Sequence, residues 1–328
     1  MSPKAIHQSF LPIHTGSVVV SRRLPLLSVR GDAAGPTVWL TACAHGDEIG
    51  GIVVVQEIFH RLRRRGLNCG QLFAFPMMNP LGFETASRHI TVGQEDLNRS
   101  FPGNPNGTLA ERIANMVFSR IKASQPQLVL DLHNDWRRSI PYSLLDPIRV
   151  ADADGIEKQS WDAAQSLGFL IIREAIGEGA LDSYNKNLSA SLRREGIPAV
   201  TVELGESYVV NERNVLLGVT AVWKALAGLN MVSPVEEPFD YPVPEHLLRT
   251  ALRYSDETSA SRSGIIRFAV KPAQLIHPGQ ILARVYNTFG HRQETLRAKN
   301  EGVILGYSDY SVTFPGMTVV ALGIIPKD

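Results

Sequence analysis

The sequence predicts an α/β fold, a mixed sheet flanked by helices, followed by a small C-terminal all-β barrel or sandwich. Over about the first 230 residues, short apolar runs alternate with longer segments of helical spacing, which is typical of helices packed on a sheet. Beyond the proline-rich stretch Ser233–Pro244, short β-like segments are broken by HPG, FPG and EG turns. We therefore expect two domains, over residues 1–235 and 245–328.

The predicted elements follow from these patterns. Six apolar runs are expected to be strands of the first domain: Val18–Val20, Val38–Ala44, Gln71–Phe75, Leu128–Leu132, Phe169–Ile172 and Ala199–Leu204. Five segments carry an apolar stripe at helical spacing: Ile49–Leu62, Leu109–Ile121, Ser160–Leu167, Leu188–Arg194 and Val215–Leu226. The tail is expected to form five strands: Gly264–Val270, Gln280–Tyr286, Glu294–Lys299, Gly302–Tyr307 and Thr318–Gly323.

Composition narrows the class of protein. Lys and Arg total 33 and Asp and Glu total 32, so the net charge of +1 supplies no broad positive field for nucleic acid. Hydrophobic residues make up 44%, an ordinary globular balance. The two cysteines, Cys43 and Cys69, cannot form a disulfide framework, and no apolar run is long enough to span a membrane. We expect a cytoplasmic protein with no nucleic-acid or membrane partner.

The segment Ala44–Gly51, AHGDEIGG, contains the first candidate metal ligands. His45 and Glu48 stand three residues apart between a predicted strand and the next helix, so a helical turn would place both side chains on one face. Such spacing also arises by chance, and a second pair, His291 and Glu294, is interpreted as a solvated surface pair. The position after a strand favours metal binding for the first pair.

A second histidine strengthens this hypothesis. The segment LVLDLHND ends a predicted buried strand with His133, and ligands of α/β sheets gather outside the carboxyl ends of strands. Two histidines and one carboxylate with an open position are typical of catalytic zinc. Asp131 lies on the same strand face as His133 and would orient its ring. The alternative is that His133 merely ends a core strand.

Three further positions are candidates for substrate chemistry. Asn98 and Arg99, in EDLNRSFPG, could clamp a carboxylate, and Arg88 is a further cation upstream. Glu203 sits among apolar residues in AVTVELGE, where burial should raise its pKa and suit it to proton transfer. Surface salt bridges for the arginines, and a buried ion pair for the glutamate, are the competing interpretations.

The motifs HGDE, NP-x-G-F (Asn79–Phe83), DLNRSFPG, DLH and VELG occur in that order. In this combination the chain resembles the succinylglutamate desuccinylase/aspartoacylase family, a branch of the zinc carboxypeptidase-like fold. The resemblance covers essentially the whole chain, and the tail is similar to the family's C-terminal barrel. Between Arg88 and DLNR the chain carries a longer connection, HITVGQE, and in this it also resembles deacetylases of N-acetyl-diaminobutyrate-type substrates.

The resemblance implies a zinc-dependent hydrolase that cleaves the amide bond of a small N-acyl amino acid, with a catalytic domain over residues 1–235. It implies one Zn²⁺ per chain, held by His45, Glu48 and His133. It implies that Glu203 is the catalytic carboxylate and that Arg88 polarises the scissile carbonyl. The implied clamp for the substrate α-carboxylate consists of Asn98 and Arg99.

Several questions stay open at this level. A succinyl or aspartyl substrate would need a further cation near the metal, for which Arg137, Arg138 and Arg193 are candidates, whereas an acetyl substrate would not. A metallocarboxypeptidase acting on small peptides and a non-catalytic metal-binding module remain alternatives. The turns of the tail, Asn287–Arg292 and Tyr307–Tyr310, contain no lysine, which disfavours a carrier domain. The tail is expected to cover part of the cleft or to support contacts in a homo-oligomer.

Overall fold

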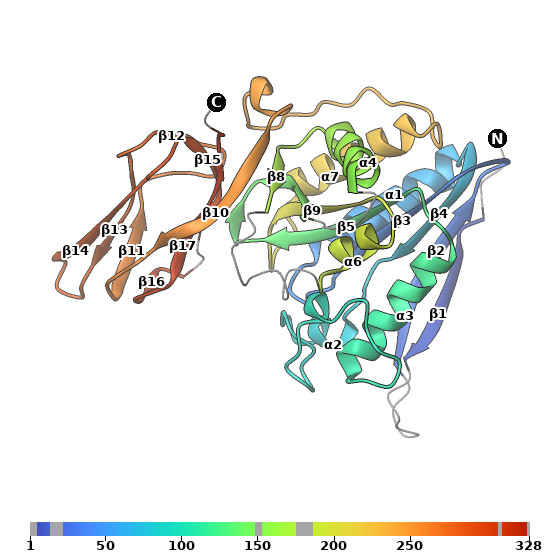
Figure 1. Cartoon of the computed structure of the whole chain (residues 1–328), viewed down its shortest axis with the longest axis horizontal. Helices are drawn as coiled ribbons and strands as arrows, with labels where there is room; N and C mark the ends of the chain where they lie inside the picture. The colour runs from blue at the N-terminus through green and yellow to red at the C-terminus, as the bar shows by residue number, and fades with distance from the viewer. Residues whose placement is uncertain (1–4, 14–21, 148–152, 175–185, 308–309, 327–328) are drawn as a thin grey trace.

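A long mixed sheet with helices on both faces forms the body of the protein, and a second, small antiparallel sheet lies at its C-terminal end (Figure 1). The structure is a computed structural model that describes residues 5–13, 22–147, 153–174, 186–307 and 310–326. The predicted strand Val18–Val20 lies outside these residues. The α/β class predicted from the sequence is confirmed.

The main sheet contains the strands β1 (His7–Ile13), β2 (Arg22–Arg30), β3 (Ala33–Ala42), β4 (Cys69–Phe75), β5 (Leu128–Asp135), β6 (Arg138–Ser139), β7 (Pro141–Leu145), β8 (Ile171–Arg173), β9 (Ala199–Glu206), β10 (Ala251–Ser259), β12 (Leu275–Ile276), β15 (Gly302–Tyr307) and β17 (Thr318–Ile324). Their order is β1-β2-β4-β3-β5-β9-β7-β8-β10-β17-β15-β12, with β6 paired to β15. β3 is parallel to β4 and β5, and β5 is parallel to β9. The carboxyl ends of β3, β5 and β9 therefore meet at one edge.

Helices cover both faces because the central strands are apolar on both sides. One face carries α1 (Gly50–Arg65), α4 (Ala153–Leu167) and α7 (Glu212–Gly228), and the other carries α2 (Pro80–Phe83), α3 (Leu109–Ala123) and α6 (Leu188–Arg194) (Figure 1). Along β3, Val38 and Leu40 pack toward the first group and Trp39 toward the second. All five predicted helices are present, although α4 begins at Ala153 rather than Ser160. The described residues also include two short 3₁₀ helices, η1 (Leu97–Arg99) and η2 (Glu245–Leu247).

The small sheet and the end of the main sheet pack face to face as a sandwich. The small sheet contains β14 (Arg292–Arg297), β13 (Ile281–Tyr286), β11 (Gly264–Phe268) and β16 (Val312–Thr313), all antiparallel in that order. Ile266 and Leu282 of this sheet share one buried cluster with Ile304 and Leu322 of the main sheet. The five predicted tail strands are confirmed as β11, β13, β14, β15 and β17.

The strand β10, which the sequence did not predict, continues the main sheet into the tail. It pairs in parallel with β8, with Leu252 opposite Ile172. Both residues lie in one buried cluster with Val303 of β15. The sheet therefore continues across the proline-rich segment that separates the two predicted domains. Among the described residues, none of the helices is both long enough and apolar enough to span a membrane.

Candidate active site

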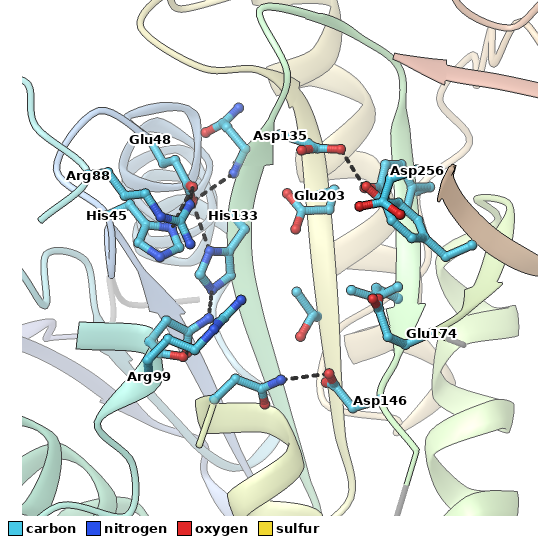
Figure 2. A pocket seen from close by; sticks show the side chains of 17 residues that line it. His45, Glu48, Arg88, Arg99, His133, Asp135, Asp146, Glu174, Glu203 and Asp256 are labelled. Carbon is cyan, nitrogen blue, oxygen red and sulfur yellow. Dashed lines mark hydrogen bonds and ion pairs between the residues drawn. The ribbon is translucent and has the colours of Figure 1, made fainter. Parts of the chain in front are cut away.

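The carboxyl ends of three neighbouring parallel strands bring the predicted site residues together. His45 lies in the turn after β3, His133 lies on β5, and Glu203 lies on β9 opposite His133 in register. All three line one pocket of about 200 Å³ (Figure 2). This placement agrees with the prediction that ligands gather at this edge of the sheet.

The turn that carries His45 is held in place by a close backbone contact. A Cβ atom on Gly46 would lie 1.9 Å from the backbone carbon of Gly82, so only glycine allows this approach. The Gly46 amide donates to the carbonyl of Ser87 at 2.9 Å. Asn79 caps α2 by accepting from the Gly82 amide at 2.8 Å. The NP-x-G-F motif thus forms the surface on which the His45 turn rests.

Glu48 lies between the two histidines and contacts both. Its Oε1 atom is 2.5 Å from Nδ1 of His45, and its Oε2 atom is 2.8 Å from Nδ1 of His133. Oε2 also accepts from the backbone amide of Asn134 at 3.1 Å. One potential ligand atom from each of the three side chains lies within 4.8 Å of the others, and all three residues are buried. The structure therefore brings the three predicted ligands together.

Each histidine uses its second nitrogen to contact another carboxylate. Nε2 of His133 is 3.0 Å from Oδ2 of Asp131, whose Oδ1 accepts from the Thr41 hydroxyl at 2.6 Å. Nε2 of His45 is 3.2 Å from Oδ1 of Asp96. Metal-binding histidines commonly have such carboxylate partners, which fix the ring and leave the other nitrogen for the ion. Asp131 was predicted for this position and Asp96 was not.

The charges of the cluster fit a divalent cation. Burial alone would raise the pKa of Glu48, but His45 and His133 reverse this and hold it below its ordinary value. Burial likewise disfavours the charged form of His133, yet Asp131 and Glu48 keep its pKa well above the ordinary value. The carboxylates thus stabilise positive charge at the His133 ring. A metal ion at the two Nδ1 atoms and the Glu48 carboxylate would supply that charge in place of a proton.

The predicted polar residues of η1 and its neighbourhood also line the pocket. Arg88 donates from Nε and Nη2 to Oδ2 of Asp96, at 3.1 and 2.9 Å, and its Nη1 lies 3.8 Å from Oε1 of Glu48. Asn98 places Nδ2 at 3.5 Å from Nε2 of His133. Arg99 donates from Nη1 to the carbonyl of Asn98 at 2.8 Å. Arg88, Asn98 and Arg99 are thus grouped beside the candidate metal ligands (Figure 2).

Glu203 occupies the centre of the pocket, across from His133 (Figure 2). Burial, and next the negative charge of Asp135, raise the pKa of Glu203 well above its ordinary value. Its Oε2 atom is buried and accepts no hydrogen bond from the described residues. A carboxyl group in this state can accept or donate a proton, as the sequence analysis expected.

The three arginines considered for a second substrate carboxylate lie elsewhere. Arg137 stacks on the ring of Tyr208, with 4.4 Å between its Cζ atom and the ring centroid. Arg138 is an exposed residue of β6, and Arg193 is fully buried beneath the pocket, where it donates to the carbonyl of Asp146. None of the three is among the residues that line this pocket in the described structure. The arginines that do line the pocket are Arg88 and Arg99.

The pocket is also lined by residues that sequence reasoning missed: Asp135, Tyr142, Asp146, Glu174, Tyr254 and Asp256. Figure 2 shows Glu174 and Asp256 across the pocket from His45. The Tyr142 hydroxyl donates to Oδ2 of Asp135 at 2.7 Å. Asp135 lies two residues after His133 of the DLH motif and could have been noticed from its place at the end of β5. Tyr254 and Asp256 could not, because β10 itself was not predicted.

Fold and site together define an α/β protein with a metallo-carboxypeptidase-like fold and a group of buried residues that could hold a metal ion. A metallo-carboxypeptidase from Burkholderia cenocepacia shares the fold, with a TM-score of 0.52 and 18% identity over 70% of this chain and 65% of that one. The family model for the succinylglutamate desuccinylase/aspartoacylase catalytic domain matches residues 34–229. The chain belongs to this family.

Two relatives resemble the chain over most of its length. A succinylglutamate desuccinylase/aspartoacylase from Rhodobacter sphaeroides has a TM-score of 0.80 and 19% identity, over 100% of this chain and 97% of that one. At this identity the likeness concerns the fold, including the C-terminal part. An N-alpha-acetyl-L-2,4-diaminobutyric acid deacetylase from Halomonas elongata is 28% identical over 284 residues, which are 82% of this chain and 77% of the relative.

Proposed function

We propose that the protein is a zinc-dependent hydrolase that releases the acyl group from a small N-acyl amino acid. The observation that carries this proposal is the pocket in which two histidines and a glutamate converge beside a buried, protonatable glutamate. In the proposal His45, Glu48 and His133 hold Zn²⁺. The ion, when bound, would act as a Lewis acid and lower the pKa of a water molecule.

The residues of the chain would then divide the remaining work. Glu203 would take a proton from the attacking water and pass it to the leaving amine, because its Oε2 accepts no hydrogen bond from the described residues. Arg88 would donate to the oxygen of the scissile carbonyl, where negative charge develops. Asn98 and Arg99 would hold the substrate carboxylate, and their place beside His133 would bring the amide to the reacting groups.

For the acyl half we propose an acetyl group. Succinyl and aspartyl groups carry a second carboxylate, and the pocket offers only Arg88 and Arg99 as arginines among its described lining residues. In our scheme both are already used, one for the carbonyl and one for the α-carboxylate. The Halomonas relative, by its name, removes an acetyl group from diaminobutyric acid. We propose a similar substrate here, an Nα-acetyl amino acid with a second amino group.

The test is a substrate screen of the zinc-loaded protein. N-acetyl, N-succinyl and N-aspartyl amino acids and dipeptides are supplied separately, and release of free amine is followed. We expect hydrolysis of the N-acetyl compounds, loss of activity after chelation, and recovery when Zn²⁺ is returned. Preferred cleavage of dipeptides would instead identify a carboxypeptidase.

A matched variant separates the chemistry from metal binding. Glu203→Gln keeps the size of the side chain but cannot take a proton, so kcat should fall by about 10²- to 10⁴-fold while zinc content stays unchanged. Circular dichroism would verify the fold. An active Glu203→Gln enzyme, or an active wild-type enzyme without metal, would refute the proposal.

A further inference from the structure

The pocket contains more carboxyl groups than the proposed chemistry uses. Two of them, Glu48 and Glu203, have assigned roles, and four do not: Asp135, Asp146, Glu174 and Asp256. In Figure 2, Arg88 and Arg99 lie on the side of His45, Asp135 lies next to Glu203, and Glu174 and Asp256 lie across the pocket beyond Glu203. The pocket is therefore bipolar, with arginines on one side and carboxylates on the other.

The tail supplies part of this acidic side. Arg253 of β10 and Arg173 of β8 are the last paired residues of these two parallel strands. Tyr254 follows Arg253, and Glu174 follows Arg173. Burial, and next the charges of Asp135 and Glu174, raise the pKa of Tyr254 well above its ordinary value. The tyrosine therefore stays neutral and adds no further negative charge to this side. Asp256, one side chain further along the same face of β10, is exposed at the rim.

A separate observation indicates that a donor is lacking. Asp146 is only 3% exposed, and its Oδ1 accepts from Nδ2 of Asn187 at 2.6 Å. Its Oδ2 is buried and accepts no hydrogen bond from the described residues, and Asp146 is one of the residues that line the same pocket. Leaving a buried carboxyl oxygen without a donor is unfavourable, and most such atoms in proteins have a partner. A ligand that brings N–H groups would supply the missing donor.

We propose that Asp135, Asp146, Glu174 and Asp256 form a subsite for a positively charged amino acid side chain, with Glu174 and Asp256 as specificity-determining residues. This proposal rests on the proposed function, because it assigns the amine half of the substrate to the side of the pocket away from the metal ligands. An ammonium group there gains charge-assisted hydrogen bonds from the carboxylates. The C-terminal part is then a substrate-selecting element, since β10 carries Asp256 and Tyr254.

The test compares two substrates of nearly equal shape. Nα-acetyl-L-2,4-diaminobutyrate has a charged side-chain end, and N-acetyl-L-norvaline has a methyl group in its place. Wild-type enzyme should prefer the charged substrate in kcat/KM. Asp256→Asn and Glu174→Gln should each lower this preference by about tenfold, because each removes one charged partner. Asp256→Glu should restore most of it.

The matched control is Glu301→Gln, which removes an exposed carboxylate of the tail that faces His277 instead of the pocket. It should leave the preference between the two substrates unchanged. Thermal unfolding would verify that each variant is folded. The proposal is overturned if Asp256→Asn and Glu174→Gln lower kcat/KM equally for both substrates, or if wild-type enzyme prefers N-acetyl-L-norvaline.

Binding of the free amino acids keeps this proposal distinguishable from the proposed function. Calorimetry with zinc-loaded protein should show tighter binding of L-2,4-diaminobutyrate than of L-norvaline, and Asp256→Asn should remove that difference. If no acyl amide is hydrolysed but this binding preference is found, the proposed function fails and the subsite stands. If acyl amides are hydrolysed but the binding preference is absent, the subsite fails and the proposed function stands.

Discussion

The two sides of the pocket differ in how their negative charges are matched. On the side of the candidate metal ligands, Glu48 contacts two imidazoles, and Asp96 contacts an imidazole and the guanidinium of Arg88. On the opposite side, Asp146 has a buried oxygen without a donor among the described residues. The first side groups its carboxylates with imidazoles and a guanidinium, whereas on the second side Asp146 has an oxygen that accepts no hydrogen bond from the described residues. This difference agrees with our proposal that the first side holds the metal and the second binds the substrate.

The largest expected effect is a loss of metal affinity, caused by a substitution that changes only the side of the candidate metal ligands. Asp96 fixes His45, receives Arg88, and accepts from the Asn98 amide at 2.8 Å, so one carboxylate positions three predicted site residues. Asp96→Asn removes its charge and should weaken Zn²⁺ binding by about 10- to 100-fold. Competition with a chromogenic chelator measures this change.

Asp256→Asn is the comparison for that experiment. Both variants remove one carboxylate that lies near the pocket, but Asp256 contacts neither histidine in the described structure. Its zinc affinity should therefore equal that of the wild type. If the two variants weakened zinc binding alike, the division of the pocket into a metal side and a substrate side would be wrong.

The side with the candidate metal ligands is also the part whose residues the sequence analysis singled out. His45 and His133 follow apolar runs that read clearly as buried strands, and parallel neighbours place their carboxyl ends at one edge. The order of the strands along the chain was therefore enough to predict that His45 and His133 lie close together. Asp96 was missed inside a motif that was noticed, because nothing in the order of residues indicates that its side chain turns back to His45.

The acidic side was not predicted, for a physical reason. The strand β10 reads ALRYSDETS, in which polar residues hide the alternation that marks a strand, and its partner β8 lies about 80 residues earlier in the sequence. Long-range pairing of this kind depends on packing of residues such as Leu252, which local patterns do not reveal. The carboxylates therefore converge from segments whose proximity only the fold establishes.

A smaller effect should come from the arginine that we assign to the substrate carboxylate. Arg99→Lys keeps the charge but loses the planar fork that binds a carboxylate with two hydrogen bonds. KM should rise by about tenfold with little change in kcat, because binding is weakened and the reacting groups are untouched. Steady-state kinetics with one N-acetyl amino acid measures both constants. An unchanged KM would mean that another residue holds the carboxylate.

The smallest expected effect is a shift in the pH dependence of kcat/KM, caused by the influence of Asp135 on Glu203. The proposed base acts only when deprotonated, so kcat/KM should fall as pH falls through the raised pKa of Glu203. Burial raises the pKa of Asp135 to about 6, and above that pH its negative charge raises the pKa of Glu203 further. Asp135→Asn removes this charge, so the acid limb should move to lower pH, by less than about one unit. Rate profiles of wild type and variant test the sign. A limb that stayed in place would show that Asp135 is too well screened to influence Glu203, and a limb that moved to higher pH would contradict the assignment of Glu203 as the base.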